Sequence, residues 1–190
     1  KSFFKGSLIG VPGLFKSWRK GNVGIINAIG TGVADDKVVY SYVNKMIVYY
    51  LGEQPILNQV ETYLCHEKIQ RDYVIENISK LVVKPANASG GYGIMIGPKA
   101  PLKEREEVIN KIKKNPREFI AQPLEILSTA PTITENDIEP RHLDLRPFVL
   151  SGKTSYVTTG GLTRVALRKG STIVNSSQGG GSKDTLIVDM

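Results

Sequence analysis

The chain has 190 residues, of which 41% are hydrophobic and 23% are charged, so its composition is that of a globular domain and excludes a disordered tail, a collagen and a coiled coil. The net charge of +7 is uneven, because residues 1–50 hold seven basic and two acidic side chains and residues 151–190 hold five and two. A single cysteine and two histidines exclude an internal disulfide framework and argue against a cysteine-built or histidine-rich metal site.

Glycine and proline punctuate short apolar stretches over the first 20 residues, and no clear element begins there. Because the chain also starts with Lys1, we expect it to be a C-terminal piece of a longer protein, although a tag remnant or a processed end is also consistent. Residues 22–29 predict a short buried strand, which ends at the turn 30–32.

Apolar residues at helical spacing predict three helices after this strand. The first is capped by Asp35 or Asp36 and ends at Gly52, which is a good C-terminal stop. The second lies near 68–80. The third, near 102–114, is so polar that we expect it to lie on the surface with a narrow apolar stripe.

Short β-type runs predict strands between these helices and after them. They lie at 81–84, 93–96, 119–122, 146–150, 163–168 and 172–174. The mixture predicts an α+β or α/β fold with a substantial antiparallel component. The one biased segment, 175–183, is rich in glycine and serine, and we expect it to be flexible unless a ligand orders it.

The sharpest feature is a strand that ends at Lys84 and Pro85 and is followed by a loop of small residues, 88–93. The lysine places an ammonium group on a rigid element, and the glycines let backbone N–H groups approach an anion, so together they suit a polyphosphate. The loop is not a Walker A motif, because no Gly-Lys-Ser/Thr and no helix follow, and it is not a dinucleotide fingerprint, because it joins two strands. A glycine-rich hairpin with a surface lysine is an equally consistent interpretation.

A second lysine, Lys37, lies in the first turn of the first predicted helix. A cation is unfavourable beside the positive end of a helix dipole, so an anion bound at that helix start would explain its position. The alternative is a solvated pair with the neighbouring Asp36.

The strand at 119–122 runs into Pro123, Leu124 and Glu125. A strand exit stiffened by proline leaves backbone N–H and C=O groups that can read an adenine edge without a charged side chain. A plain strand end explains the same residues equally well.

The C-terminal third contributes charged and glycine-rich segments. Period-2 alternation puts Asp144 and Arg146 on one strand face, and Arg164 follows a Gly-Gly-Leu-Thr run. With the amide- and glycine-rich segment 175–181, the two arginines can clamp an acyl phosphate or a γ-phosphate. The alternatives are a structural ion pair of Asp144 with Arg146 and a mobile tail for the second glycine loop.

These motifs, in this order, closely resemble the circularly permuted ATP-grasp proteins of type 2, a bacterial family related to glutathionylspermidine synthase. The resemblance extends over nearly all of the chain, and its motifs lie at 10–14, 35–37, 82–85, 90–93, 120–124, 141–149, 160–166 and 175–184. It implies an α+β fold of the ATP-grasp type, circularly permuted and incomplete in this chain, in which the nucleotide lies between two subdomains.

The resemblance also implies roles for single residues. Lys37 and Lys84 correspond to paired ATP lysines, Arg164 corresponds to a phosphate or acyl-phosphate ligand, and Arg146 joins it as a candidate catalytic residue. The implied nucleotide-binding residues are Ser89, Gly90, Gly91, Tyr92 and Gly93 in the loop over the phosphates and Ala121, Gln122, Pro123 and Leu124 in the adenine hinge. The expected domain organisation is a lead-in α/β segment at 1–80, the ATP-grasp lysine, loop and hinge at 81–125, and a second subdomain with the arginines at 126–190.

By this resemblance the protein is an ATP-dependent carboxylate–amine ligase, or its ATP-binding part, that uses ATP and Mg²⁺ and works through an acyl phosphate. In the family, a segment with an arginine and an acidic cluster resembles the magnesium site, so we expect the metal ligands upstream of Lys1. Asp144 and Asn175 are the candidate metal contacts within the chain. The alternative is a non-catalytic nucleotide-binding or interaction module with the same fold.

Neither a membrane nor a nucleic acid is an expected partner. No apolar run approaches the roughly 18 residues that span a bilayer and no signal peptide is visible, so we expect a soluble protein of a reducing compartment, the cytoplasm. No interleaving of aromatic and basic residues stands out, and the excess charge clusters where phosphate ligands are expected. The expected partners are ATP and small-molecule or peptide carboxylate and amine substrates.

Overall fold

The computed structural model describes residues 10–27, 29–88, 90–135, 137–172, 174 and 180–186. The chain forms two compact units, Lys1–Pro55 and Ile56–Met190. Helices and antiparallel strands both contribute, which confirms the predicted α+β class. Within the described ranges, no helix is both long enough and apolar enough to cross a membrane.

Short helices make up the described part of the first unit. They are α1 (Leu14–Arg19), the 3₁₀-helix Thr31–Asp35, α2 (Lys37–Tyr40) and α3 (Val43–Leu51). Asp36 is the N-cap of α2, and its carboxylate accepts a hydrogen bond from the Val38 N–H at 2.8 Å, as predicted. α3 ends at Gly52, which is also as predicted, and this glycine has the left-handed conformation.

The single helix expected between Asp36 and Gly52 is divided in two. The Ser41 hydroxyl donates to the Val38 carbonyl at 2.7 Å, and a turn at Ser41 and Tyr42 separates α2 from α3. A serine side chain competes with the helix for a backbone carbonyl, and the periodicity of apolar residues does not reveal that competition.

The prediction of a buried strand at 22–29 is wrong. The described residues of that segment form turns and irregular chain, and Ile26 is 95% exposed rather than buried. A strand needs a neighbour to satisfy its backbone N–H and C=O groups, and every strand among the described residues belongs to the second unit. Within the described part of its own unit, the apolar run therefore has no sheet to join.

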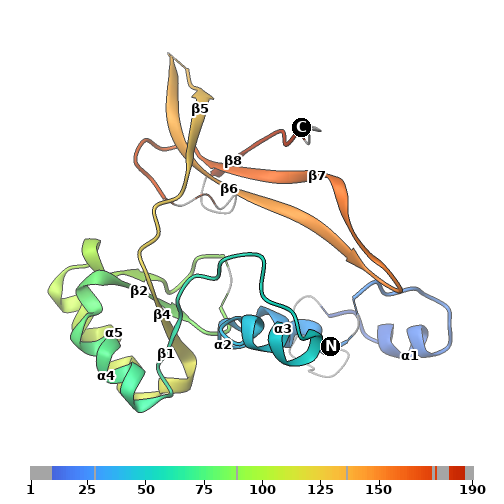
Figure 1. Cartoon of the computed structure of the whole chain (residues 1–190), viewed down its shortest axis with the longest axis horizontal. Helices are drawn as coiled ribbons and strands as arrows, with labels where there is room; N and C mark the ends of the chain where they lie inside the picture. The colour runs from blue at the N-terminus through green and yellow to red at the C-terminus, as the bar shows by residue number, and fades with distance from the viewer. Residues whose placement is uncertain are drawn as a thin grey trace. The chain divides into compact units, whose positions relative to one another are not determined.

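The second unit contains a four-stranded antiparallel sheet of order β1-β4-β2-β3. Figure 1 labels β1, β4 and β2 of this sheet. Its strands are β1 (Tyr63–Leu64), β2 (Leu81–Pro85), β3 (Met95–Ile96) and β4 (Phe119–Pro123), and its helices are α4 (Lys68–Glu76), the 3₁₀-helices Ile78–Lys80, Gly97–Lys99 and Pro116–Glu118, and α5 (Leu102–Lys114). The predicted strands at 81–84 and 119–122 are confirmed, as is the helix at 102–114. The strand predicted at 93–96 is limited to its last two residues.

One face of this sheet is buried against α4 and α5 (Figure 1). The buried cluster includes Val83 and Ala121 from the sheet and the fully buried Ile112 from α5. Successive side chains of a strand point to opposite faces, so Lys84 and Gln122, which adjoin these residues, point to the face that the helices do not cover.

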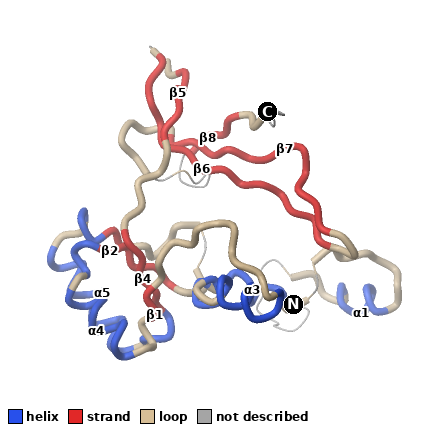
Figure 2. The backbone as a smooth tube through the Cα atoms, in the orientation of Figure 1, coloured by secondary structure: helices blue, strands red, loops and turns tan. Residues whose placement is uncertain are grey.

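A second antiparallel sheet has the order β5-β6-β7-β8, and its two central strands form a long ribbon (Figure 2). Its strands are β5 (Thr129–Ile133), β6 (Ile138–Ser151), β7 (Ser155–Ala166) and β8 (Gly180–Lys183). The run predicted at 146–150 lies within β6, and most of the run at 163–168 lies within β7. The register shifts between Pro147 and Val149, where a proline without an N–H interrupts the ladder of hydrogen bonds.

The end of the chain differs from the expectation of a flexible segment at 175–183. Residues 180–183 form β8, which pairs with the end of β7, and residues 175–179 lie outside the described residues. Backbone hydrogen bonds to an open strand edge do not require side chains, so even a glycine-rich segment can pair there. The last predicted strand is not observed, because its described residues, Thr172 and Val174, are irregular.

We expect Gly97→Ala to destabilise the second unit. A Cβ at Gly97 would lie 2.0 Å from the carbonyl oxygen of Ile78 and 2.6 Å from that of Leu81. Both oxygens belong to the backbone, so side-chain movement cannot relieve the clash, and the free energy of unfolding should fall by about 2 kcal/mol or more. Urea unfolding of the purified variant measures this loss.

Gly160→Ala is the matched control for this variant. A Cβ at Gly160, in β7, would meet nothing within 4 Å. The control should therefore change the free energy of unfolding by no more than about 0.5 kcal/mol. Equal losses in the two variants would contradict the packing argument at Gly97.

Candidate functional site

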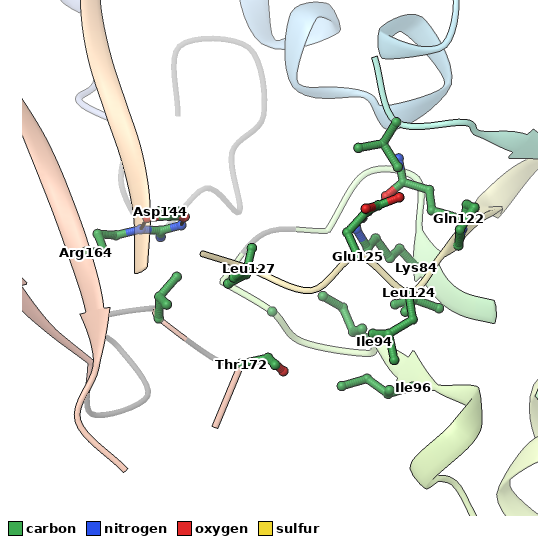
Figure 3. A pocket seen from close by; sticks show the side chains of 15 residues that line it. Lys84, Ile94, Ile96, Gln122, Leu124, Glu125, Leu127, Asp144, Arg164 and Thr172 are labelled. Atoms are coloured by element: carbon green, nitrogen blue, oxygen red, sulfur yellow. Dashed lines mark hydrogen bonds and ion pairs between the residues drawn. The ribbon is translucent and has the colours of Figure 1, made fainter. Parts of the chain in front are cut away.

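A cavity of about 430 Å³ opens in the second unit, on the face of the first sheet that α4 and α5 leave uncovered. Its volume is in the range of sites for small ligands. Val82 and Ile96 contribute apolar wall from neighbouring strands. Ile94, Leu124 and Leu127 contribute it from loops (Figure 3). These surfaces suit an uncharged and preferably flat part of a ligand.

Polar side chains gather at two ends of the cavity (Figure 3). Lys84, Gln122 and Glu125 lie at one end, on β2, β4 and the loop that follows β4. Asp144 and Arg164 lie at the other end, on β6 and β7. The cavity therefore offers a ligand an apolar middle with charged groups at both ends.

A chain of hydrogen bonds holds the Lys84 ammonium group. Its Nζ donates to Gln122 Oε1 at 2.5 Å, and Gln122 Nε2 donates to Thr62 Oγ1 at 2.8 Å. The Thr62 hydroxyl in turn donates to the Val60 carbonyl at 3.0 Å. Gln122 is only 8% exposed, so protein groups on both sides fix its amide.

The glycine-rich loop requires glycine at three positions. Gly90, Gly91 and Gly93 have φ angles of 71°, 81° and 72°, which lie in the left-handed region that residues with a Cβ rarely adopt. A Cβ on Gly93 would also lie 2.9 Å from the ring of Pro85, so the loop folds back closely onto the end of β2. Gly91 lines the cavity, and the other two glycines shape the loop beside it.

The exit of β4 runs along the cavity. Pro123, Leu124 and Glu125 line it, so the backbone expected to read an adenine edge lies at the cavity wall. The loop that follows is tied to β6, because His142 Nδ1 lies 2.8 Å from the Leu127 carbonyl oxygen. A carbonyl oxygen can only accept, so this ring nitrogen carries the proton and donates.

Asp144 and Arg164 face each other across β6 and β7. They are register partners, and Arg164 donates from Nε to Asp144 Oδ1 at 2.8 Å and from Nη2 to Oδ2. These hydrogen bonds, more than the charge of Arg146, hold the pKa of the Asp144 carboxyl below its usual value. The same contact raises the pKa of the Arg164 guanidinium. The ion pair thus joins Asp144 to Arg164 rather than to Arg146.

The predicted nucleotide-binding and catalytic residues divide between the cavity and other places. Those that line the cavity are Lys84, Gly91, Gln122, Pro123, Leu124 and Arg164. The side chain of Ala121 belongs to the core on the opposite face of the sheet. Tyr92 and Arg146 are exposed and do not line the cavity, and Ser89 lies outside the described residues.

Lys37 is the first residue of α2 and belongs to the first unit. Burial lowers the pKa of its ammonium group, against the charges of Asp36 and Asp35, which raise it. A partly buried cation at a helix start is compatible with an anionic ligand. Because Lys37 and Lys84 belong to different units, their convergence on one ligand stays a prediction.

The described residues fit a nucleotide better than they fit a magnesium ion. Among them, no three or more histidine, cysteine, aspartate or glutamate side chains form a group that could hold a metal ion. Asp144, a candidate metal contact, is engaged by Arg164, and Asn175 lies outside the described residues. Apolar walls beside an anchored ammonium group and a glycine loop instead match a base with attached phosphates.

Sequence reasoning missed part of the cavity wall. Val60, Leu127, Thr172 and Val174 line it, and no motif singled them out. All four lie in irregular segments, whose course depends on tertiary contacts rather than on local patterns. The direction of the Gln122 side chain could have been predicted, because strand alternation makes it opposite to that of the preceding residue, the buried Ala121.

The fold is of the α+β class, and the lining of the cavity suits a small ligand with an anionic part. The chain belongs to the circularly permuted ATP-grasp type 2 family, which it matches over residues 1–166. This match confirms the resemblance carried by the motifs and the ATP-grasp type of fold.

Relatives of the chain come from several bacteria. It is 56% identical over 183 residues to an uncharacterized protein of Synechocystis sp., covering 96% of this chain and 38% of the relative. It is 52% identical over 183 residues to an uncharacterized protein of Mycobacterium tuberculosis, covering 96% of this chain and 33% of the relative. It is 50% identical over 182 residues to a protein of Frankia casuarinae named as a candidate glutamate–cysteine ligase 2-2. This match covers 96% of this chain and 21% of the relative. The chain thus spans well under half the length of these relatives.

We expect Asp144→Asn to lower the free energy of unfolding at pH 7 by about 1–2 kcal/mol, because Arg164 keeps its charge and loses the carboxylate that accepts its hydrogen bonds. The folded-state pKa of Asp144 lies below its unfolded value of about 4, so the carboxylate stabilises the fold above that pH. This contribution is lost as the pH falls through the lower, folded-state pKa. Urea unfolding of the wild type and of Asp144→Asn, at pH 7 and in acid, measures the difference between their free energies of unfolding. This difference should become smaller below pH 4.

Asp72→Asn controls for the loss of a carboxylate that is not held in this way. It breaks the ion pair of Asp72 with Lys68 on α4. The side chains of Asp72 and Lys68 are 57% and 81% exposed, so the loss of this pair should change the free energy of unfolding little at any pH. If wild type and Asp144→Asn differ in free energy of unfolding by the same amount at pH 7 and in acid, the carboxylate of Asp144 is not the source of the stabilisation.

Proposed function

We propose that the cavity of the second unit binds ATP and that the full-length protein is an ATP-dependent ligase that joins a carboxylate to an amine. The observation that carries the proposal is the anchored ammonium group of Lys84, beside the Gly91 loop at one end of an apolar cavity. Membership of the ATP-grasp family supports ATP as the ligand. Two Frankia relatives named as candidate glutamate–cysteine ligases support the reaction class.

The base is proposed to occupy the apolar middle of the cavity. An adenine ring is apolar on its two faces and polar along its edge, so its faces suit side chains such as Ile94 and Leu124. Its edge would meet backbone N–H and C=O groups of residues 123–125, which line the same wall. Ala121 would contribute by keeping the strand packed on the core.

The phosphates are proposed to extend toward Lys84 and the glycine-rich loop. An ammonium group and backbone N–H groups that no Cβ obstructs both stabilise phosphate oxygens. Lys37 is proposed as a second cation for the same phosphates, and Ser89 and Tyr92 as further parts of the loop. Two cations would reduce the repulsion between the triphosphate and an incoming carboxylate.

An acyl-phosphate route accounts for the reaction. A carboxylate oxygen attacks the γ-phosphorus, the bond from that phosphorus to the bridging oxygen breaks, and ADP leaves with the electron pair. The amine nitrogen then attacks the acyl carbon, phosphate leaves, and the nitrogen loses a proton. Arg164, oriented by Asp144, and Arg146 are proposed to contact the transferred phosphoryl group, so the protein acts by positioning and by charge neutralisation.

The alternative function is a non-catalytic nucleotide-binding module that uses the same cavity. Both functions need ATP binding, and they differ only in turnover. We place either function in the cytoplasm, where ATP is available.

Lys84→Ala should weaken ATP binding by about 1–3 kcal/mol, the range for a charge-assisted hydrogen bond. Isothermal titration of the full-length protein with ATP measures the change. Lys113→Ala, which removes an exposed lysine on α5, is the matched control and should leave the affinity unchanged. An affinity that does not respond to Lys84→Ala would remove Lys84 from the site.

Turnover separates the two functions. The full-length protein should release ADP and phosphate from ATP and Mg²⁺ only when a pool of amino acids, peptides or polyamines supplies both a carboxylate and an amine. Coupled detection of ADP, with each pool omitted in turn, measures this dependence. Tight ATP binding without turnover in any pool would favour the non-catalytic module.

A further inference from the structure

We propose that Gln122 is a positioning residue for the phosphate-binding lysine and not a reader of the adenine base. This inference rests on the nucleotide function proposed for the cavity. By its place in the chain, Gln122 belongs to the strand exit expected to form the adenine hinge. Its side chain instead bonds to the Lys84 ammonium group at 2.5 Å, on the neighbouring strand β2 (Figure 3).

The neighbours of the Gln122 amide fix which of its ends faces Lys84. An ammonium group can only donate, so it requires the amide oxygen. The Thr62 hydroxyl donates its hydrogen to the Val60 carbonyl, so its oxygen remains to accept from the amide nitrogen at 2.8 Å. A flipped amide would oppose donor to donor at Lys84 and acceptor to acceptor at Thr62, so a single orientation satisfies all the groups.

The sheet makes this anchor rigid. Gln122 is the register partner of Val82, and Lys84 is the register partner of the fully buried Ile120. A long, flexible lysine side chain ordinarily loses conformational entropy when its end is fixed. Because Gln122 restricts the ammonium group before a ligand arrives, less of that entropy is lost on binding, and affinity for the phosphates increases.

The amide is also suited to this task because it is neutral. It holds the ammonium group by a hydrogen bond without cancelling its charge. A carboxylate at position 122 would hold Lys84 as an ion pair and would compete with a phosphate for the same cation. The anchor therefore favours the phosphate part of a nucleotide and is indifferent to the base.

Binding of ATP and of adenosine to the full-length protein tests this inference. Gln122→Met keeps the length of the side chain and removes its acceptor, so the Kd for ATP should rise about five- to tenfold, as for the loss of one hydrogen bond. The Kd for adenosine, which has no phosphate, should change less than about twofold. Asn110→Leu, an amide-to-apolar change on the exposed side of α5, should alter neither affinity.

A double-mutant cycle shows whether Gln122 acts through Lys84. In a Lys84→Met background, Gln122→Met should have little further effect on the Kd for ATP, because the group that it positions is gone. Thr62→Val removes the hydroxyl that accepts from the Gln122 amide nitrogen, so it should also raise the Kd for ATP. This variant replaces Gln122→Met in the test if Gln122→Met does not fold.

The outcomes are distinguishable. Equal weakening of ATP and adenosine binding by Gln122→Met, no weakening of either, or the same weakening in the Lys84→Met background would overturn the positioning role while the cavity remains a nucleotide site. A wild-type protein that binds neither ATP nor adenosine would overturn the proposed function and this inference together.

Discussion

The alternation of side chains along β2 and β4 is the constraint on which the site depends. Burial of Val83 and Ala121 against the helices obliges Lys84 and Gln122 to point to the opposite face. A slip of either strand by one residue would exchange the two sets and place an ammonium group in the core. The packing of the core, and not an interaction within the cavity, therefore sets the direction of the lysine.

The elements that could be predicted from the sequence are those decided by local interactions. The bounds of α5 follow from a narrow apolar stripe between polar faces, and the start of α2 follows from the side chain of Asp36. The errors concern pairing. An apolar run at 22–29 forms no strand, whereas the glycine-rich residues 180–183 do, because the edge of β7 accepts them. Whether a partner strand is within reach is a property of the fold and not of the segment.

The same distinction applies to the candidate site. Lys84 and Gly91 could be proposed from the sequence because a lysine at a strand end and a glycine loop are neighbours in the chain. The contact of Gln122 with Thr62 spans 60 residues, and the contact of Asp144 with Arg164 spans 20 and depends on the register of β6 with β7. Period-2 alternation correctly grouped Asp144 with Arg146 on one strand, but it could not show which residue lies across from Asp144.

The two cations of the cavity, Lys84 and Arg164, are anchored by groups that respond differently to acidification. Asp144 is a carboxylate, so protonation at low pH removes its charge. The charge of the Arg164 guanidinium is then no longer compensated by Asp144. Gln122 has no proton to gain or lose over the range in which proteins remain folded. An acidic medium therefore makes the arginine end of the cavity more electropositive and leaves the hydrogen-bond acceptor at the lysine end unaltered.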